Sequence, residues 1–128
     1  MHDLPLVGLR VLVMEDEFLI AMDVEQLCRD HGAAEVVLVR TLDGLRSGPA
    51  AEAAFHAAIL DVTLAGCSTL AFAAGLAERG VPFIFATGYA ETEGLFDAFP
   101  GVPVVGKPYA GGALIEALAG AIARARAS

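Results

Sequence analysis

Five short, nearly continuous apolar runs constrain the fold of this chain more than any other feature of its sequence. A strand buried on both faces needs apolar residues at successive positions, whereas a strand with one solvent face alternates. The runs predict strands at Arg10–Met14, Val36–Val39, Ala58–Leu60, Phe83–Ala86 and Val102–Val105. Such runs are typical of a parallel sheet that is covered by helices on both sides.

A stretch with helical periodicity or high Ala content follows each of these runs. The predicted helices are Phe18–His31, Leu42–Ala54, Ser68–Arg79, Glu91–Phe99 and Gly112–Ala127. Gly32 and Gly80 are typical helix stops, whereas Pro49 interrupts the second helix and the fourth is short. Five strand–helix units joined by right-handed crossovers predict an α/β fold, a doubly wound parallel sheet in three layers.

The composition favours one packed domain and excludes several function classes. A chain of 128 residues with 56% hydrophobic residues is long enough for one core, which we expect to span residues 1–128. The net charge of −8 opposes binding to nucleic acid. Because no apolar run spans a bilayer and the N-terminus lacks a basic start, we expect a cytoplasmic protein without a membrane partner. Cys28 and Cys67 form no metal-binding spacing and are predicted to be reduced, partly buried thiols.

Polar side chains follow each of the predicted strands, at the sheet edge where ligands of such folds bind, although the second strand is followed only by Arg40 and Thr41. Glu15 and Asp16 follow the first strand, Asp61 the third, Thr87 the fourth and Lys107 the fifth. An acid or hydroxyl at a strand end is usually a turn or cap residue. Their joint occurrence at successive strand ends instead predicts a functional site.

These residue types fit the chemistry of phosphoryl transfer. Three carboxylates stay ionised together only if a cation screens them, and oxygen ligands favour Mg²⁺. A carboxylate beside the metal can act as a nucleophile and become an acyl phosphate. The Thr87 hydroxyl and the Lys107 ammonium can then meet the phosphoryl oxygens. Glu17 is expected to begin the first helix, where an acid suits the helix dipole, and not to bind metal.

Four motifs together resemble the receiver domains of bacterial two-component response regulators. They are VLVMEDE at 11–17, LDVTL at 60–64, ATG at 86–88 and GKPY at 106–109, and the resemblance covers about Leu9 to Ala127. It implies a flavodoxin-like (βα)5 sandwich that acts as a signalling switch. The phosphoryl donor would be a sensor histidine kinase or a histidine phosphotransfer protein, and a further protein would read the signal.

The resemblance also implies roles for individual residues. Glu15 and Asp16 match the acidic pair that holds Mg²⁺, together with Asp61 and the backbone carbonyl of Thr63. Asp61 matches the phospho-acceptor, while Thr87 matches the switch hydroxyl and Lys107 the family's lysine. Such a domain would catalyse its own phosphotransfer and autodephosphorylation.

Three departures from the family pattern shape the expected signal. Val104 replaces an aromatic switch residue and is predicted to lie in the core, and Ala65-Gly66 replaces a common Pro in the loop after the acceptor. The FATGY sequence at 85–89 resembles a subclass that is frequently single-domain, lacks the aromatic switch and has a malleable fourth helix. We therefore predict that Tyr89 and the Glu91–Phe99 segment carry the phosphorylation signal.

Several alternatives have different sequence requirements. A haloacid dehalogenase-like phosphatase needs a second acid where Thr63 stands, and a flavodoxin-like binder needs a phosphate-cradling loop where Glu15 and Asp16 would repel a phosphate. A receiver-like module that is never phosphorylated remains a third alternative. The sequence also leaves open whether a phosphorylated form would drive an output or act as a phosphate sink for a shared kinase.

Overall fold

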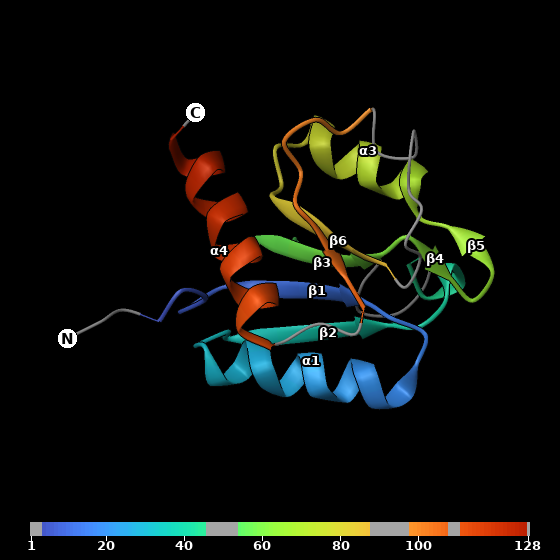
Figure 1. Cartoon of the computed structure of the whole chain (residues 1–128), viewed down its shortest axis with the longest axis horizontal. Coiled ribbons are helices and arrows are strands. Elements are labelled where there is room, and N and C mark those ends of the chain that lie inside the picture. Colours follow the sequence, from blue (N-terminus) through green and yellow to red (C-terminus); the bar gives the residue numbers. More distant parts are fainter. Residues whose placement is uncertain (1–3, 46–53, 88–97, 108–110, 128) are drawn as a thin grey trace.

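Five parallel strands form the central sheet of the computed structural model, which describes residues 4–45, 54–87, 98–107 and 111–127. The strands are β1 (Arg10–Met14), β2 (Glu35–Val39), β3 (Ala57–Asp61), β6 (Phe83–Thr87) and β7 (Val104–Gly106). Their order is β2-β1-β3-β6-β7, as Figure 1 shows. This order confirms the predicted doubly wound, flavodoxin-like sheet, and the observed strand ends lie within two residues of the predicted ones.

Helices cover both faces of the sheet (Figure 1). Helices α1 (Phe18–Asp30) and α4 (Gly111–Ala127) pack on one face, and α3 (Leu70–Glu78) packs on the other. The predicted second helix begins as a 3₁₀ turn, η1 (Leu42–Leu45), and its remainder at 46–53 lies outside the described residues. Most of the predicted fourth helix, at 88–97, also lies outside them. None of the described helices is long and apolar enough to cross a membrane.

Alternation along β1 divides the core into two layers. Successive strand side chains point to opposite faces, so Val11 and Val13 pack with α1 and α4, whereas Leu12 and Met14 pack with α3. All four side chains are at most 1% exposed. The continuous apolar run in the sequence is therefore explained by a strand with no solvent face.

Glycines end two of the helices, as the sequence predicts. Gly32 follows α1 with φ +100°, and Gly80 follows α3 with φ +73°, conformations that side-chain-bearing residues adopt at a cost. A Cβ on Gly32 would also lie 2.9 Å from the Cα of Val7. Gly32 is thus required both by its backbone conformation and by the close approach of the N-terminal segment.

A small hairpin that the sequence did not predict follows β3. Its strands are β4 (Thr63–Leu64) and β5 (Cys67–Ser68), and Leu64 pairs with Cys67 across a two-residue turn. Both turn residues have positive φ, 50° at Ala65 and 83° at Gly66, as two-residue hairpin turns often need. The Ala65-Gly66 departure from the family pattern therefore forms a tight turn beside the carboxyl edge of the sheet.

Two expectations about burial are wrong. Val104 does not lie in the core: its side chain is 40% exposed, because β7 is an edge strand whose neighbour in the described sheet is β6. The two thiols are not alike either, since Cys28 is buried within α1 and Cys67 is exposed on the hairpin. Apolar character in a short run does not distinguish a central strand from an edge strand, which has one neighbour fewer.

Candidate functional site

The fold brings the predicted site residues to one edge of the sheet. Asp61 is the last residue of β3 and Thr87 the last residue of β6, and these two strands are neighbours. Glu15 and Asp16 directly follow β1, on the other side of β3. Lys107 follows β7, where its N–H donates to the Thr87 carbonyl oxygen at 2.7 Å. The structure thus brings the predicted site residues to the carboxyl ends of neighbouring strands.

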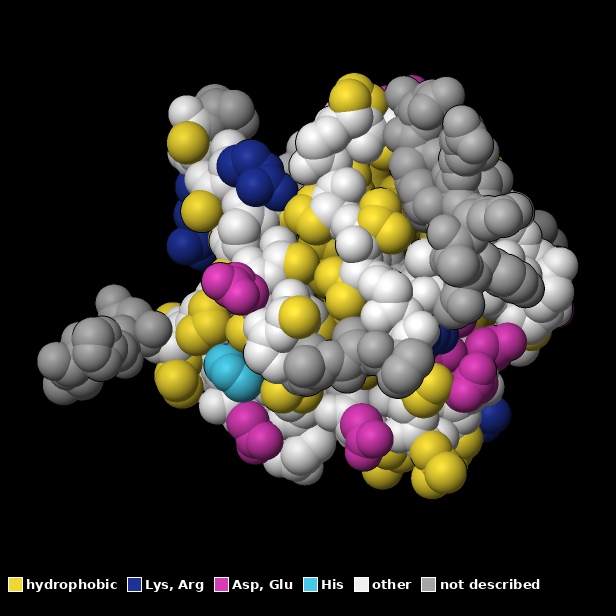
Figure 2. Space-filling view, in the orientation of Figure 1, with side chains coloured by type: hydrophobic (Ala, Val, Ile, Leu, Met, Phe, Trp, Pro, Cys, Tyr) yellow, Lys and Arg dark blue, Asp and Glu magenta, His cyan; other side chains and the backbone are white. Residues whose placement is uncertain are grey.

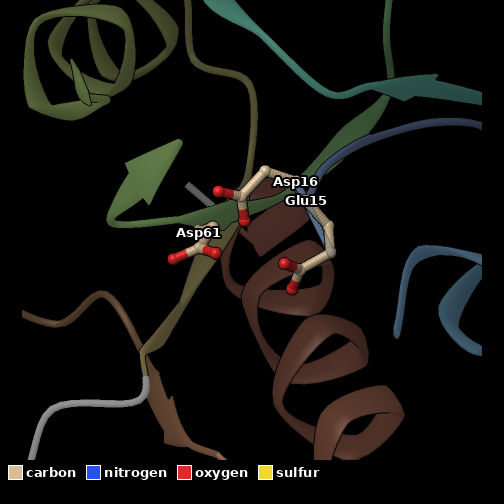
Figure 3. Close-up of side chains that lie close together, drawn as sticks. All are labelled: Glu15, Asp16 and Asp61. Atoms are coloured by element: carbon tan, nitrogen blue, oxygen red, sulfur yellow. The ribbon is translucent and has the colours of Figure 1, made fainter. Parts of the chain in front are cut away.

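Three carboxylates form the centre of this site. Oxygens of Glu15, Asp16 and Asp61 all lie within 4.8 Å of one another. In Figure 3 the three side chains project into the same space from the ends of β1 and β3. Glu15 is only 3% exposed, and Asp61 is 9% exposed. The site is therefore a concentrated, largely desolvated cluster of negative charge, which we call the carboxylate pocket.

Lys107 bridges two of the three carboxylates. Its Nζ donates to Glu15 Oε1 at 2.6 Å and to Asp61 Oδ2 at 2.9 Å. Burial acts to lower the pKa of Lys107, but the hydrogen bonds with Glu15 and Asp61 outweigh it and raise this pKa to about 12. Lys107 is thus held as a cation and balances part of the charge in the pocket.

Burial raises the pKa of Glu15 above its usual value, although Lys107 and the N–H of Glu17 act in the opposite direction. The Glu17 N–H donates to Glu15 Oε2 at 3.2 Å. A raised carboxyl pKa means that the ionised form is disfavoured in the folded protein, so this charge costs stability at neutral pH. A further cation in the pocket would relieve that cost.

Backbone and cationic groups that sequence reasoning did not assign to the site fix Asp16. The Ala65 N–H in the hairpin turn donates to Asp16 Oδ2 at 2.9 Å. The Arg40 guanidinium donates to the Asp16 carbonyl oxygen at 3.3 Å and lies over the Phe18 ring, 5.5 Å from its centroid. Arg40 follows β2 at the same sheet edge, and that position was the available sequence signal. The hairpin had no such signal in the sequence, because Ala is unusual at the positive φ that Ala65 adopts.

Threonines hold the end of β3 in place. The Thr63 N–H donates to Asp61 Oδ1 at 3.3 Å. Thr69 is fully buried, and its hydroxyl donates to the Asp61 carbonyl oxygen at 2.6 Å, a contact with no signal in the sequence. Thr87 is 3% exposed at the end of β6. Tyr89 lies outside the described residues.

The donor set fits a magnesium ion. Glu15, Asp16 and Asp61 offer oxygen ligands at mutual distances that one small cation can bridge, and no nitrogen or sulfur ligand joins this group among the described residues. Glu17 precedes α1 as its N-cap residue, as the sequence predicts, and approaches the pocket through its backbone N–H.

No family model and no curated protein sequence matches this chain. Solved structures do. SdrG from Sphingomonas melonis Fr1 is 33% identical, with a TM-score of 0.74 over 93% of this chain and 98% of that one. The response regulator PhyR from Brucella abortus is 29% identical, with a TM-score of 0.75 over 94% of this chain. A response regulator receiver protein from Sinorhizobium medicae WSM419 is 20% identical, with a TM-score of 0.74 over 91% of this chain and 96% of that one.

The fold, together with its carboxylate pocket, defines a receiver-type signalling domain. The chain belongs to the receiver domains of response regulators. It spans half the length of the Brucella PhyR protein, so the activity of that whole protein is not transferred here.

Proposed function

We propose that the chain is a phosphorylation-dependent switch that accepts a phosphoryl group on Asp61. The observation that supports this most directly is the cluster of Glu15, Asp61 and Lys107, in which one ammonium bridges two nearly buried carboxylates. Such a cluster has the charge and the ligands to hold a phosphoryl group next to a divalent cation. The donor would be a phosphohistidine of a sensor kinase or of a phosphotransfer protein.

The covalent step needs only Asp61 as nucleophile. A carboxylate oxygen of Asp61 attacks phosphorus in line with the bond from phosphorus to the histidine nitrogen. That P–N bond breaks, its electron pair stays on the imidazole, and an acyl phosphate forms. Thr63 holds the Asp61 carboxylate through its N–H, and Thr69 holds the Asp61 backbone, so the nucleophile is positioned before the donor arrives.

Cationic groups around Asp61 would stabilise the transferred group. Lys107 is already 2.9 Å from Asp61 and can meet a phosphoryl oxygen without a large movement. The Thr87 hydroxyl would donate to another. Glu15, Asp16, Asp61 and the Thr63 carbonyl would hold Mg²⁺, which when bound neutralises charge on the phosphoryl oxygens.

The signal would reach a protein partner through the segment after β6. Val104 offers no aromatic ring, so we assign the response to Thr87, Tyr89 and the 88–101 segment, as in the Phe-Ala-Thr-Gly subclass. A protein with a beryllofluoride-activated receiver domain, NtrC4, has the same fold, with a TM-score of 0.76, which makes beryllofluoride a suitable phosphoryl mimic. Amide exchange with and without it should change at 88–101. An unchanged 88–101 segment beside a shift on another face would contradict this route.

Phosphorylation itself is tested by one substitution with a matched control. Asp61→Asn should abolish labelling by a phosphodonor such as acetyl phosphate in Mg²⁺, because the amide is not a nucleophile that forms an acyl phosphate. Glu17→Gln should leave labelling largely intact, since Glu17 contacts the pocket only through its backbone N–H. Intact-mass measurement gives the labelled fraction. Labelling that survives Asp61→Asn would remove Asp61 as the acceptor.

A further inference from the structure

A groove that the proposed switch does not use lies at the amino end of strand β6, opposite the carboxyl ends that form the carboxylate pocket. It encloses about 370 Å³ between the C-terminal ends of α3 and α4, the start of β6 and the 100–103 segment. In Figure 2 apolar side chains show between α4 and α3, and arginine side chains of α4 border them. Strand β6 runs from Phe83 in this groove to Thr87 in the site, so the two places are separate.

Most of the residues that line the groove are apolar. These apolar residues include Val81, Pro82, Phe83, Val102, Pro103 and Ala121. Phe83 and Ala121 are 4% and 8% exposed and form its floor, and Phe83 packs edge-on against Phe99 with ring centroids 6.0 Å apart. Because proline fixes φ and the floor is core, the groove is largely formed before anything binds.

The main chain around the groove offers few hydrogen-bond donors. Pro82, Pro100 and Pro103 have no N–H, and the N–H groups of Val81 and Val102 already donate to carbonyl oxygens within the fold. A partner strand would therefore find little to pair with here. Recognition has to come from apolar contact and from charged side chains at the rim.

The rim is basic in an acidic protein. Arg124 lines the groove, and Arg79 and Arg126 are exposed within two residues of lining positions. Across the described ranges none of these arginines pairs with a carboxylate: Arg79 and Arg124 donate to carbonyl oxygens instead. In the 77–83, 100–103 and 121–126 segments the only acid is Glu78. Arginines that have no carboxylate partner among the described residues lie beside apolar walls, on a chain of net charge −8, and this favours an acidic occupant.

We propose that this groove binds an acidic peptide segment of a protein partner, in which bulky apolar side chains enter the groove and a neighbouring carboxylate meets Arg124. This proposal goes beyond the phosphorylation switch and does not depend on it. All residues that line the groove are in place without a phosphoryl group on Asp61, so the unphosphorylated chain is used to test peptide binding.

The probe is a randomised linear peptide library displayed on phage and selected against the full chain. We expect enrichment of sequences that combine Asp or Glu with Leu, Ile or Phe. The enriched peptides, made synthetically with a fluorophore, should shift backbone NMR signals of residues 100–103 and 121–125. Arg124→Glu should weaken their binding about tenfold or more in fluorescence anisotropy, because it replaces attraction by repulsion at a partly desolvated rim.

Two control variants separate local recognition from net charge. Arg29→Glu makes the same change of net charge on α1, where Arg29 pairs with Glu25 at the surface, and binding should stay within about twofold. Arg124→Lys keeps the positive charge and should retain most of the affinity. If Arg124→Glu lowers the folded fraction by circular dichroism, Arg124→Gln replaces it in the comparison.

Each of the following results would overturn the proposal: a selection without acidic enrichment, equal binding to wild type and Arg124→Glu, NMR shifts confined to another face, or weakening by Arg29→Glu equal to that by Arg124→Glu. Concentration-dependent dimerisation that competes with the selected peptides would also overturn it, by assigning the groove to a second copy of the chain. Loss of phosphorylation in Asp61→Asn leaves this test unaffected, so the two proposals fail separately.

Discussion

Lys107 is the residue through which charge in the carboxylate pocket is balanced, because its ammonium contacts both Glu15 and Asp61. Its pKa rises from 10.5 to about 12 on folding. A raised pKa gives stability that is fully present below pH 10.5 and is lost as the pH rises through about 12. The change corresponds to about 2 kcal/mol of unfolding free energy.

We therefore expect the unfolding free energy of the wild type to fall on the alkaline side by about 2 kcal/mol more than that of Lys107→Met. Urea unfolding at a series of alkaline pH values gives both curves. Lys107→Met should also be less stable at neutral pH, since it leaves Glu15 and Asp61 without their shared cation. Parallel alkaline curves would show that Lys107 does not make this contribution.

At the scale of elements, Gly32 joins the end of α1 to the N-terminal segment. Gly32→Ala should destabilise by about 2 kcal/mol or more, because positive φ is unfavourable for Ala and the new Cβ would contact the backbone of Val7. Gly80→Ala is the matched control: it has positive φ after α3 but open space around its Cβ position, so about 1 kcal/mol is expected. Urea unfolding measures both. Equal losses would mean that the contact with Val7 costs nothing.

At the scale of the whole molecule, the proposed metal site would link Mg²⁺ binding to folding. Mg²⁺ that binds only the native state should raise the unfolding free energy and the melting temperature with concentration, since three carboxylates from two strand ends meet only in the fold. Asp16→Asn should reduce the rise, and NaCl at equal ionic strength should not reproduce it. Thermal unfolding monitored by circular dichroism measures these shifts. A melting temperature that does not change with the Mg²⁺ concentration would argue against the proposed metal site.

The sequence by itself determined the sheet, the flanking helices α1, α3 and α4, and which polar residues follow the strands at the carboxyl edge. Buried parallel strands need continuous apolar runs, and their carboxyl ends meet at one edge, so Glu15, Asp16, Asp61, Thr87 and Lys107 could be grouped without coordinates. These inferences rest on periodicity and on local chemistry, which a sequence carries directly.

Only the tertiary structure decided which groups surround those residues and which surfaces are left open. The contact of Ala65 with Asp16, the exposure of Val104 and the basic rim around Arg124 all depend on segments that are distant in the chain. Burial and hydrogen-bond partners are set by how the helices and strands pack. The sequence gives the type of a residue, but its exposure is fixed only when these elements pack together.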